Sequence, residues 1–305
     1  MKVKITLSVM LITLITVFAA CNSTVDSAGQ NKDSSKVDSL SDKALMDTIQ
    51  HATFNYFWKG AETNSGMAPE RINVNGEYPQ DDENVVTVGG SGFGLMAILV
   101  GIKRGYISRS QALDRFKKIV AFLEKADRFH GVWPHWLYGK TGKVKPFSSK
   151  DDGGDLVETS FLVQGLLCVR QYFKEGSQEE KALAKRIDKL WKDVDWQWYT
   201  HGENVLYWHW SPVYGWQMNF PIHGYNECLI TYILAASSPT QGVSAKVYHQ
   251  GWAEHGKIKA PTEHFGYTLQ LHHQGNGAAS GGPLFWAHYS YLGLAPKGLK
   301  DKYAD

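Results

Sequence analysis

The sequence predicts an all-α fold in which an inner ring of helices is wrapped by an outer ring, an α/α toroid. No convincing run of residues alternates between polar and apolar as half-buried strands do. Instead, two kinds of helix alternate. Some are apolar nearly all round and therefore buried, at 94–104, 155–173, 225–236 and 283–294. Others are charged on one face and suited to cover them, at 108–127 and 177–194. An irregular helical bundle is the alternative.

The first 21 residues resemble a lipoprotein signal peptide. Lys2 and Lys4 precede an apolar run that ends near Phe18 and is too short for a stable membrane span. Small residues directly before Cys21 favour cleavage and lipid attachment at this cysteine, and an ordinary secretory signal is the alternative. Residues 22–40 are rich in Ser, Asp, Asn and Lys, which predicts a flexible tether. We therefore expect an exported protein, lipid-anchored at Cys21 in the outer membrane or periplasm.

Residues 41–305 contain the helix signals of the folded domain. Ser41, Ser108 and Ser177 are suited to cap helices, and Gly60, Gly105 and Gly176 to end them. Asp155 begins a helix that runs to about Phe173. Further helices are expected at 225–236, 243–252 and 283–294. Long loops at 61–88, 128–154, 195–222 and 254–282 lead into the buried helices, so we expect these loops to gather at one end of the ring and form a site there.

The composition limits the partners of this domain. The formal net charge of +2 over 305 residues gives no electrostatic argument for nucleic acid or a membrane surface, and we expect a monomer. Aromatic content is 13%, with 11 Trp, which means extra core or a surface for flat apolar faces such as sugar rings. Cys168 and Cys228 lie in apolar stretches and are expected to be buried, with a disulfide left open.

The strongest cluster of reactive side chains is Asp151, Asp152, Asp155 and Glu158, at the start of an apolar helix. A capping box explains Asp155 and Glu158, because acids favour helix N-termini. It does not explain the neighbouring acids. Carboxylates crowded against an apolar wall raise at least one pKa, as a general acid near neutral pH requires. Glu227, at the start of the next apolar helix, is either a second catalytic acid or half of a structural ion pair.

Aromatic residues are dense in the loops around these acids. Eight lie between Trp196 and Trp216, in a loop that also holds His201 and His209. Trp133 and Trp136 flank His135 just before the acidic segment. Acids beside aromatic platforms suit a saccharide, because sugar rings stack on aromatics while hydroxyls bond to polar groups. Alternatively, about half of these rings pack the loops onto the helices.

Other motifs carry little weight. The glycine-rich segment 89–94 has no predicted strand before it, so it does not indicate a dinucleotide site, although its N–H groups could meet a phosphate or a sugar hydroxyl. Adjacent His272 and His273 lack an acidic partner at helical spacing, and the two cysteines lack a zinc spacing. We expect no metal and no cofactor.

Five segments resemble the glucoamylase-like lipoproteins of glycoside hydrolase family 144: 90–94 (GSGFG), 133–136 (WPHW), 151–159 (DDGGDLVET), 224–227 (GYNE) and 281–290 (GGPLFWAHYS). The resemblance covers nearly all of the mature chain. It implies an (α/α)6 barrel that hydrolyses β-1,2-glucan with inversion, as an endo-glucanase or by releasing sophorose. A non-catalytic glycan-binding lipoprotein and an enzyme for another glucan linkage are the alternatives.

The resemblance also implies the site residues. Its essential acids correspond to Asp151, Asp155, Glu158 and Glu227, and we expect Glu227 to be the general acid, with Glu158 the next candidate. Substrate contacts are expected from aromatic and polar side chains near these acids: Trp133, His135, Trp136, Trp208, Trp210, Trp216, His223, Tyr225, Asn226, Trp286 and His288.

The family's barrel has more helices than the roughly eight predicted in this sequence. Residues 41–305 therefore resemble the N-terminal two-thirds of the catalytic domain, and further site residues, including the base, could belong to the remainder. We expect the 305-residue polypeptide alone to be inactive or unstable.

The lipid anchor can be tested directly. Cys21→Ser should abolish incorporation of labelled palmitate and release the protein from the membrane fraction, because the only thiol at the processing site is removed. Cys168→Ser, which changes a cysteine inside the folded domain, should keep the label. Labelling that persists in Cys21→Ser would contradict the assignment.

Overall fold

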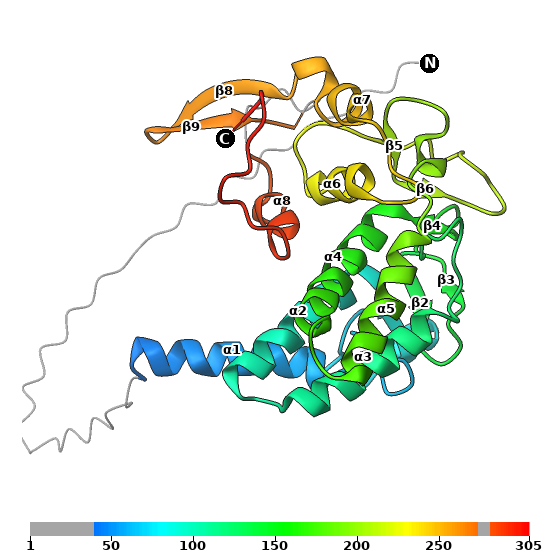
Figure 1. Cartoon of the computed structure of the whole chain (residues 1–305), viewed down its shortest axis with the longest axis vertical. Coiled ribbons are helices and arrows are strands. Elements are labelled where there is room, and N and C mark those ends of the chain that lie inside the picture. Colours follow the sequence, from blue (N-terminus) through cyan, green and yellow to red (C-terminus); the bar gives the residue numbers. More distant parts are fainter. Residues whose placement is uncertain (1–39, 274–280, 305) are drawn as a thin grey trace, which may run out of the picture. The chain divides into compact units, whose positions relative to one another are not determined.

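The computed structural model describes residues 40–273 and 281–304, so the predicted signal peptide and nearly all of the predicted tether lie outside the described residues. Residues Asp42–Asp305 form one compact unit. It is mainly helical, as predicted (Figure 1). The α-helices are α1 (Asp42–Trp58), α2 (Val88–Arg104), α3 (Arg109–Leu123), α4 (Leu156–Phe173), α5 (Gln178–Lys192), α6 (Leu229–Ser237), α7 (Ala245–Val247) and α8 (Leu284–His288).

The ends of several helices lie where the sequence predicted them. Ser108 and Ser177 form capping boxes with Gln111 and Glu180, so two backbone N–H groups are satisfied at each start. Asp155 caps α4 by accepting a hydrogen bond from the N–H of Glu158. At the other end of α2, Gly105 adopts a left-handed conformation (φ 73°) and ends the helix.

Helices α2 and α4 form the centre of the unit, where they pack at very short range. A Cβ at Gly92 would lie 2.1 Å from the carbonyl oxygen of Phe161, and one at Gly165 would lie 2.2 Å from the carbonyl oxygen of Gly92. The glycine-rich segment 89–94 is thus part of α2, which begins at Val88 and not at residue 94. Its glycines allow the two backbones to touch.

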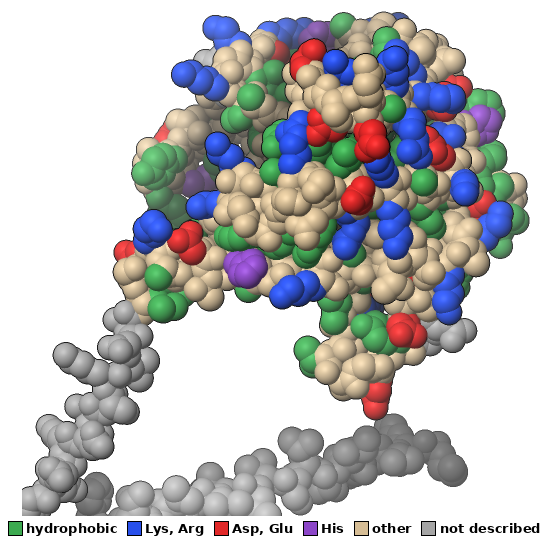
Figure 2. Space-filling view, turned by 60° about the horizontal axis from the view of Figure 1, so that its bottom comes forward, with side chains coloured by type: hydrophobic (Ala, Val, Ile, Leu, Met, Phe, Trp, Pro, Cys, Tyr) green, Lys and Arg blue, Asp and Glu red, His purple; other side chains and the backbone are tan. Residues whose placement is uncertain are grey.

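The outer helices cover this pair as the charge pattern predicted. Helix α4 is buried over most of its length, from Leu156 to Phe173. Helix α5 packs against α4 and also contacts α3 (Figure 1). It turns Leu183, Ile187 and Leu190 inward and leaves its charged face to solvent. On the face shown in Figure 2, Lys and Arg side chains are mixed with Asp and Glu, in keeping with the small net charge.

Two helix predictions were wrong in part. Helix α6 begins at Leu229, four residues later than expected, because Tyr225–Cys228 form a turn that the apolar residues alone do not reveal. The segment 283–294 is not a buried helix. It contains α8 and a 3₁₀ turn (Tyr289–Tyr291), and Leu284 is 71% exposed. Its apolar composition suggested burial, but α8 has no buried residue.

Short strands, which the sequence did not reveal, join the long loops. They are β1 (Val85–Thr87), β2 (Trp136–Tyr138), β3 (Val144–Lys145), β4 (Gly154–Asp155), β5 (Leu206–Tyr207), β6 (His209–Trp210), β7 (Pro221–Ile222), β8 (Lys259–His264) and β9 (Tyr267–Leu271). Because β1 pairs with β2 and β4 pairs with β6, three of the four long loops meet, as expected. Strand β1 precedes the glycine-rich start of α2, but its antiparallel pairing is unlike the parallel unit of a dinucleotide site.

Both cysteines of the folded unit are free, so the disulfide that was left open is not formed. Cys228 is buried as expected, and Cys168 is partly buried. Among the described residues, no helix combines the length and apolar character needed to cross a membrane.

The contact between α2 and α4 can be tested with Gly165→Ala. The added methyl group meets the backbone of α2, so we expect the free energy of unfolding to fall by about 1–3 kcal/mol, although alanine normally favours a helix over glycine. Urea unfolding followed by circular dichroism measures this. Lys185→Ala, on the exposed face of α5, should leave stability unchanged. A Gly165→Ala protein as stable as the wild type would contradict the proposed close packing.

Candidate active site

Asp155 is the centre of the site and its side chain is completely buried. One carboxylate oxygen accepts the N–H of Glu158 at 2.9 Å. The other lies 2.9 Å from Nδ1 of His135 and accepts the indole N–H of Trp208 at 3.2 Å. The backbone fixes this arrangement, because Asp155 N–H donates to the Trp133 carbonyl and Leu156 N–H to the Trp208 carbonyl. Asp155 therefore ties the 128–154 and 195–222 loops to the start of α4.

Glu158 lies one helical turn further along α4. Its Oε2 accepts the N–H of Gly89 at 2.9 Å, so the N-terminus of α2 faces this carboxyl group. Burial raises the pKa of Glu158 to about 7, and the charges of Asp155 and Glu227 add to the rise. The positive charge of His135 and the Gly89 hydrogen bond act in the opposite direction. The prediction that crowding would raise the pKa of one of these acids is confirmed.

His135 carries the opposite charge in this cluster. Burial by itself would lower the pKa of the imidazole, but the hydrogen bond and charge of Asp155, with the charges of Glu158 and Asp151, raise it to about 9. The ring is therefore protonated at neutral pH and donates to Asp155. The imidazole also stacks on Phe147 at 4.2 Å and meets Trp136 edge-on at 5.6 Å.

Asp151 lies behind this group and is also buried. Its Oδ1 lies 3.1 Å from Nε2 of His209. The same nitrogen lies 3.3 Å from the N–H of Gly153, which brings the acidic segment against β6. By accepting the Gly153 N–H, His209 fixes the backbone next to Asp151, a role that the sequence did not indicate for it.

The spacing of His135, Asp151 and Asp155 would suit a metal ion, because one ligand atom from each lies within 4.8 Å of the others. Their chemistry does not favour it. The oxygens of Asp155 already accept hydrogen bonds from Glu158, His135 and Trp208. These contacts account for the cluster as a hydrogen-bonded ion pair.

Glu227 belongs to the turn before α6. Its carbonyl oxygen accepts the hydroxyl of Ser290, whose Oγ also accepts the N–H of Ile230, so the turn and the helix start are held together. Burial raises the pKa of the Glu227 carboxyl, and the charge of Asp155 raises it further. No Lys or Arg pairs with Glu227 anywhere in residues 40–273 and 281–304, so the structural ion pair considered above is not formed. Glu227 and Glu158 act on each other electrostatically, and both act on Tyr289.

Two exposed aromatic residues that the sequence analysis missed stack on the partners of Asp155. Phe220 stacks on Trp208 at 5.1 Å with nearly parallel rings, and Phe147 packs between His135 and Trp136. Phe147 and Phe220 are about half exposed, at 49% and 50%. An isolated Phe in a polar loop was the available signal.

Several predicted substrate contacts have other positions. Trp133 is fully buried and donates its indole N–H to the Leu123 carbonyl, so the prediction that it touches substrate was wrong. The buried Asn226 accepts the N–H of Cys228 and shapes the turn. Trp210 and Trp216 belong to a separate aromatic cluster around Trp198.

The remaining predicted contacts lie around the Glu227 turn. The carbonyl of Tyr225 lies 3.2 Å from Nδ1 of His273, which in turn packs against Trp286. His223 is exposed, 3.9 Å from Glu254, and His288 is exposed on α8.

The influence of His135 on Glu158 can be measured. The imidazolium lowers the pKa of Glu158, so His135→Gln should raise it above 7, as read from the ¹³C chemical shift of the carboxyl group. In the wild type, the folded-state pKa of His135 of about 9 exceeds the ordinary 6.5. Protonated His135 therefore contributes fully to the free energy of unfolding below pH 6.5, and this contribution is lost as the pH rises toward 9. The stability of His135→Gln should not fall over this pH range on that account, whereas the stability of His264→Gln, in the exposed hairpin, should fall as in the wild type. A Glu158 pKa that stays the same or falls would contradict this account.

Comparisons with known proteins agree on one family. Residues 219–305 match the family model described as "Glycoamylase: Putative glucoamylase". The structure resembles the endo-β-1,2-glucanase of Chitinophaga pinensis, solved with sophorotriose and glucose, with 67% identity and a TM-score of 0.85 over 87% of this chain and 63% of that one. A "putative glucoamylase" from Bacteroides caccae gives 66% identity and a TM-score of 0.83 over the same shares.

A characterised relative is more distant. The exo β-1,2-glucooligosaccharide sophorohydrolase (non-reducing end) of Parabacteroides distasonis is 46% identical over 286 residues, which are 87% of this chain and 38% of that protein. The chain thus spans less than two thirds of the length of these relatives. The chain is thus similar to the "putative glucoamylase" family over residues 219–305 and, over most of its length, to solved β-1,2-glucanases.

Proposed function

We propose that this protein is a glycoside hydrolase that cleaves β-1,2-glucan. The observation that carries the proposal is the pair of partly buried acids, Glu158 and Glu227, which have raised pKa values and interact electrostatically. Exposed aromatic rings stack on His135 and Trp208, the partners of Asp155. Hydrolysis of a glycosidic bond needs one carboxylic acid that stays protonated near neutral pH and a second group that activates water. The β-1,2 linkage follows from the named activities of the relatives.

Glu227 is the proposed general acid. Its carboxyl group has no ion-pair partner among the described residues, and burial favours its protonated form. It can therefore donate a proton to the leaving glycosidic oxygen without breaking an existing interaction. Glu158 is held by the Gly89 N–H, and with a pKa of about 7 it is divided between its protonated and ionised forms near neutral pH. In its ionised form it can orient a water molecule or accept a proton from it.

Asp155 and Asp151 act through their neighbours in this proposal. Asp155 uses both oxygens to hold Glu158, His135 and Trp208. The resulting wall presents the Trp208 and Phe220 rings, on which a glucose ring can stack. Asp151 and His209 support the same segment from behind.

Two wider features belong to the proposal. The packing of α5 over α4, and of α3 against α2 and α5, supports an (α/α)6 toroid, in which the described helices form part of the ring. The segment Lys2–Cys21 supports export and lipid attachment, which would place the domain where extracellular glucan is met.

The assignment of Glu227 is tested by Glu227→Gln, assayed here and below in a protein that spans the full length of the relatives. We expect the release of reducing ends from β-1,2-glucan to fall by about 10²–10⁴-fold, the usual contribution of a general acid, while the affinity for sophorotriose changes little. Glu175→Gln, an exposed acid after α4, is the matched control and should keep full activity.

Two other results would overturn parts of this proposal. If Glu227→Gln cleaves the glucan at a near wild-type rate, Glu227 is not the general acid. Tight binding of β-1,2-glucan by the wild type without any release of reducing ends would identify a non-catalytic glycan-binding protein. A panel of glucans with other linkages, assayed in parallel, decides the linkage.

A further inference from the structure

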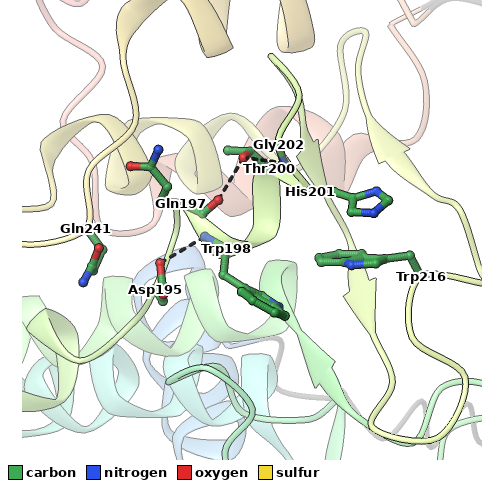
Figure 3. Close-up of a pocket in the computed structure, with 8 residues that line it drawn as sticks. All are labelled: Asp195, Gln197, Trp198, Thr200, His201, Gly202, Trp216 and Gln241. Atoms are coloured by element: carbon green, nitrogen blue, oxygen red, sulfur yellow. Dashed lines mark hydrogen bonds between the residues drawn. The ribbon is translucent and has the colours of Figure 1, made fainter.

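The loop after α5 forms an aromatic pocket of about 440 Å³ that the proposed mechanism does not use (Figure 3). Its walls carry two indoles, an imidazole, two amides and a carboxylate, from Trp198, Trp216, His201, Gln197, Gln241 and Asp195. We propose that this pocket is an accessory site that binds a glucan chain. The proposal relies on the proposed function for the class of ligand.

The pocket is separated from the acids by a buried ring. Tyr199 is fully buried, and its hydroxyl lies so close to Gly154 of β4 that a Cβ there would come within 2.0 Å of it. On its other side, the Tyr199 ring meets Trp216 edge-on at 5.8 Å. A saccharide in the pocket would therefore lie on the far side of β4, the strand that contains Asp155, and none of the residues that line the pocket contacts Asp155 or Glu158.

Trp208, just before β6, and Trp210, within β6, belong to two different aromatic groups. Trp208 donates its indole N–H to Asp155 and stacks on Phe220. Trp210 instead packs edge-on against His130 and Trp198, at 5.0 Å and 6.1 Å. The short pairing of β4 with β6 thus lies between one aromatic group at the acids and another in the outer pocket.

The loop holds Trp198 rigidly at the surface. Trp196 and Tyr199 are buried anchors on both sides of it, whereas Trp198 is 39% exposed. The N–H of Trp198 donates to Asp195 at 3.0 Å (Figure 3), and His130 stacks on the indole at 3.7 Å. An aromatic ring that is already fixed in place loses little conformational entropy when a ligand binds. Core packing does not account for this arrangement, because the Trp198 ring is not buried.

The polar groups indicate a neutral, polyhydroxylated ligand. The residues lining the pocket include no Lys or Arg, and Asp195 adds a negative charge, so an anion is disfavoured. The amides of Gln197 and Gln241 can donate to and accept from hydroxyl groups. His201 stacks on Trp216 at 4.7 Å and completes an aromatic wall. A pyranose, with an apolar face and a rim of hydroxyls, matches these features.

A second site of this kind would favour polymers over short oligosaccharides. A long chain can occupy the proposed substrate site at the acids (called the cleft below) and the pocket together. Its second contact is then intramolecular and benefits from a high effective concentration. A trisaccharide gains nothing from the pocket while it occupies the cleft. The pocket therefore predicts tighter binding of polymer that depends on Trp198.

The experiment measures, by titration calorimetry, the affinity of the full chain for polymeric β-1,2-glucan and for sophorotriose. Trp198→Ala should weaken polymer binding about tenfold and leave the affinity of the cleft for sophorotriose unchanged. Trp198→Phe, which keeps an aromatic face, should retain most of the polymer affinity. Tyr267→Ala, another exposed aromatic residue, on β9, should behave as the wild type. Thermal unfolding curves verify that each variant is folded.

Two outcomes would overturn the accessory site. One is an unchanged polymer affinity in Trp198→Ala. The other is an equal loss for polymer and sophorotriose, because this would place Trp198 in the cleft. Failure of the proposed function looks different: polymer binding that depends on Trp198, in a protein that releases no reducing ends, would overturn hydrolysis and support the pocket.

Discussion

The buried carboxylate of Asp155 is the interaction on which the rest of the site depends. It caps α4 and accepts hydrogen bonds from the His135 imidazolium and the Trp208 indole. A buried carboxylate is tolerated only when its oxygens are hydrogen-bonded or paired with charge. Asp155 meets this condition with partners from both adjoining loops and from α4. Without it, the N-terminus of α4 and the two loops would have no common anchor, and Glu158 would lose the positive charge beside it.

The burial that fixes Asp155 also prepares Glu158 for chemistry. The short approach of α2 to α4, which Gly92 and Gly165 permit, brings the N–H of Gly89 within 2.9 Å of the Glu158 carboxyl. Packing thus removes water from this group, and the neighbouring charges hold its pKa at about 7. The same contacts therefore pack the core and set the electrostatics of the site. The backbone contact between two central helices determines the environment of a candidate catalytic acid.

The aromatic residues of the loops divide into three groups with different roles. Trp133, Trp196 and Tyr199 are buried and fix the loops to the helices. Trp208 and Phe220 stack beside the acids, whereas Trp198 and Trp216 line the outer pocket. All belong to two loops with similar composition. Their separation depends on the β4–β6 pairing and on Tyr199, which together place one group on each side of the acidic strand.

The sequence by itself determined the helical class, most helix boundaries and the acidic segment. Capping residues such as Ser108 and Ser177, and the period of apolar residues, act locally and can be read along the chain. It also indicated that one of the crowded acids would have a raised pKa. It did not reveal the strands of two or three residues, because their stability comes from partners 50 or so residues away.

Only the tertiary structure decided which aromatic rings are buried, which lie beside the acids and which form the outer pocket. It also decided that Glu227 lies in a turn held by Ser290, that α8 is exposed, and that His135 is a cation. Burial and pKa depend on neighbours that are distant in sequence, such as Gly89 for Glu158 and Asp155 for His135. Local pattern identifies the residue types, but the desolvation and charge that give them their chemistry arise only when the loops and helices are packed together.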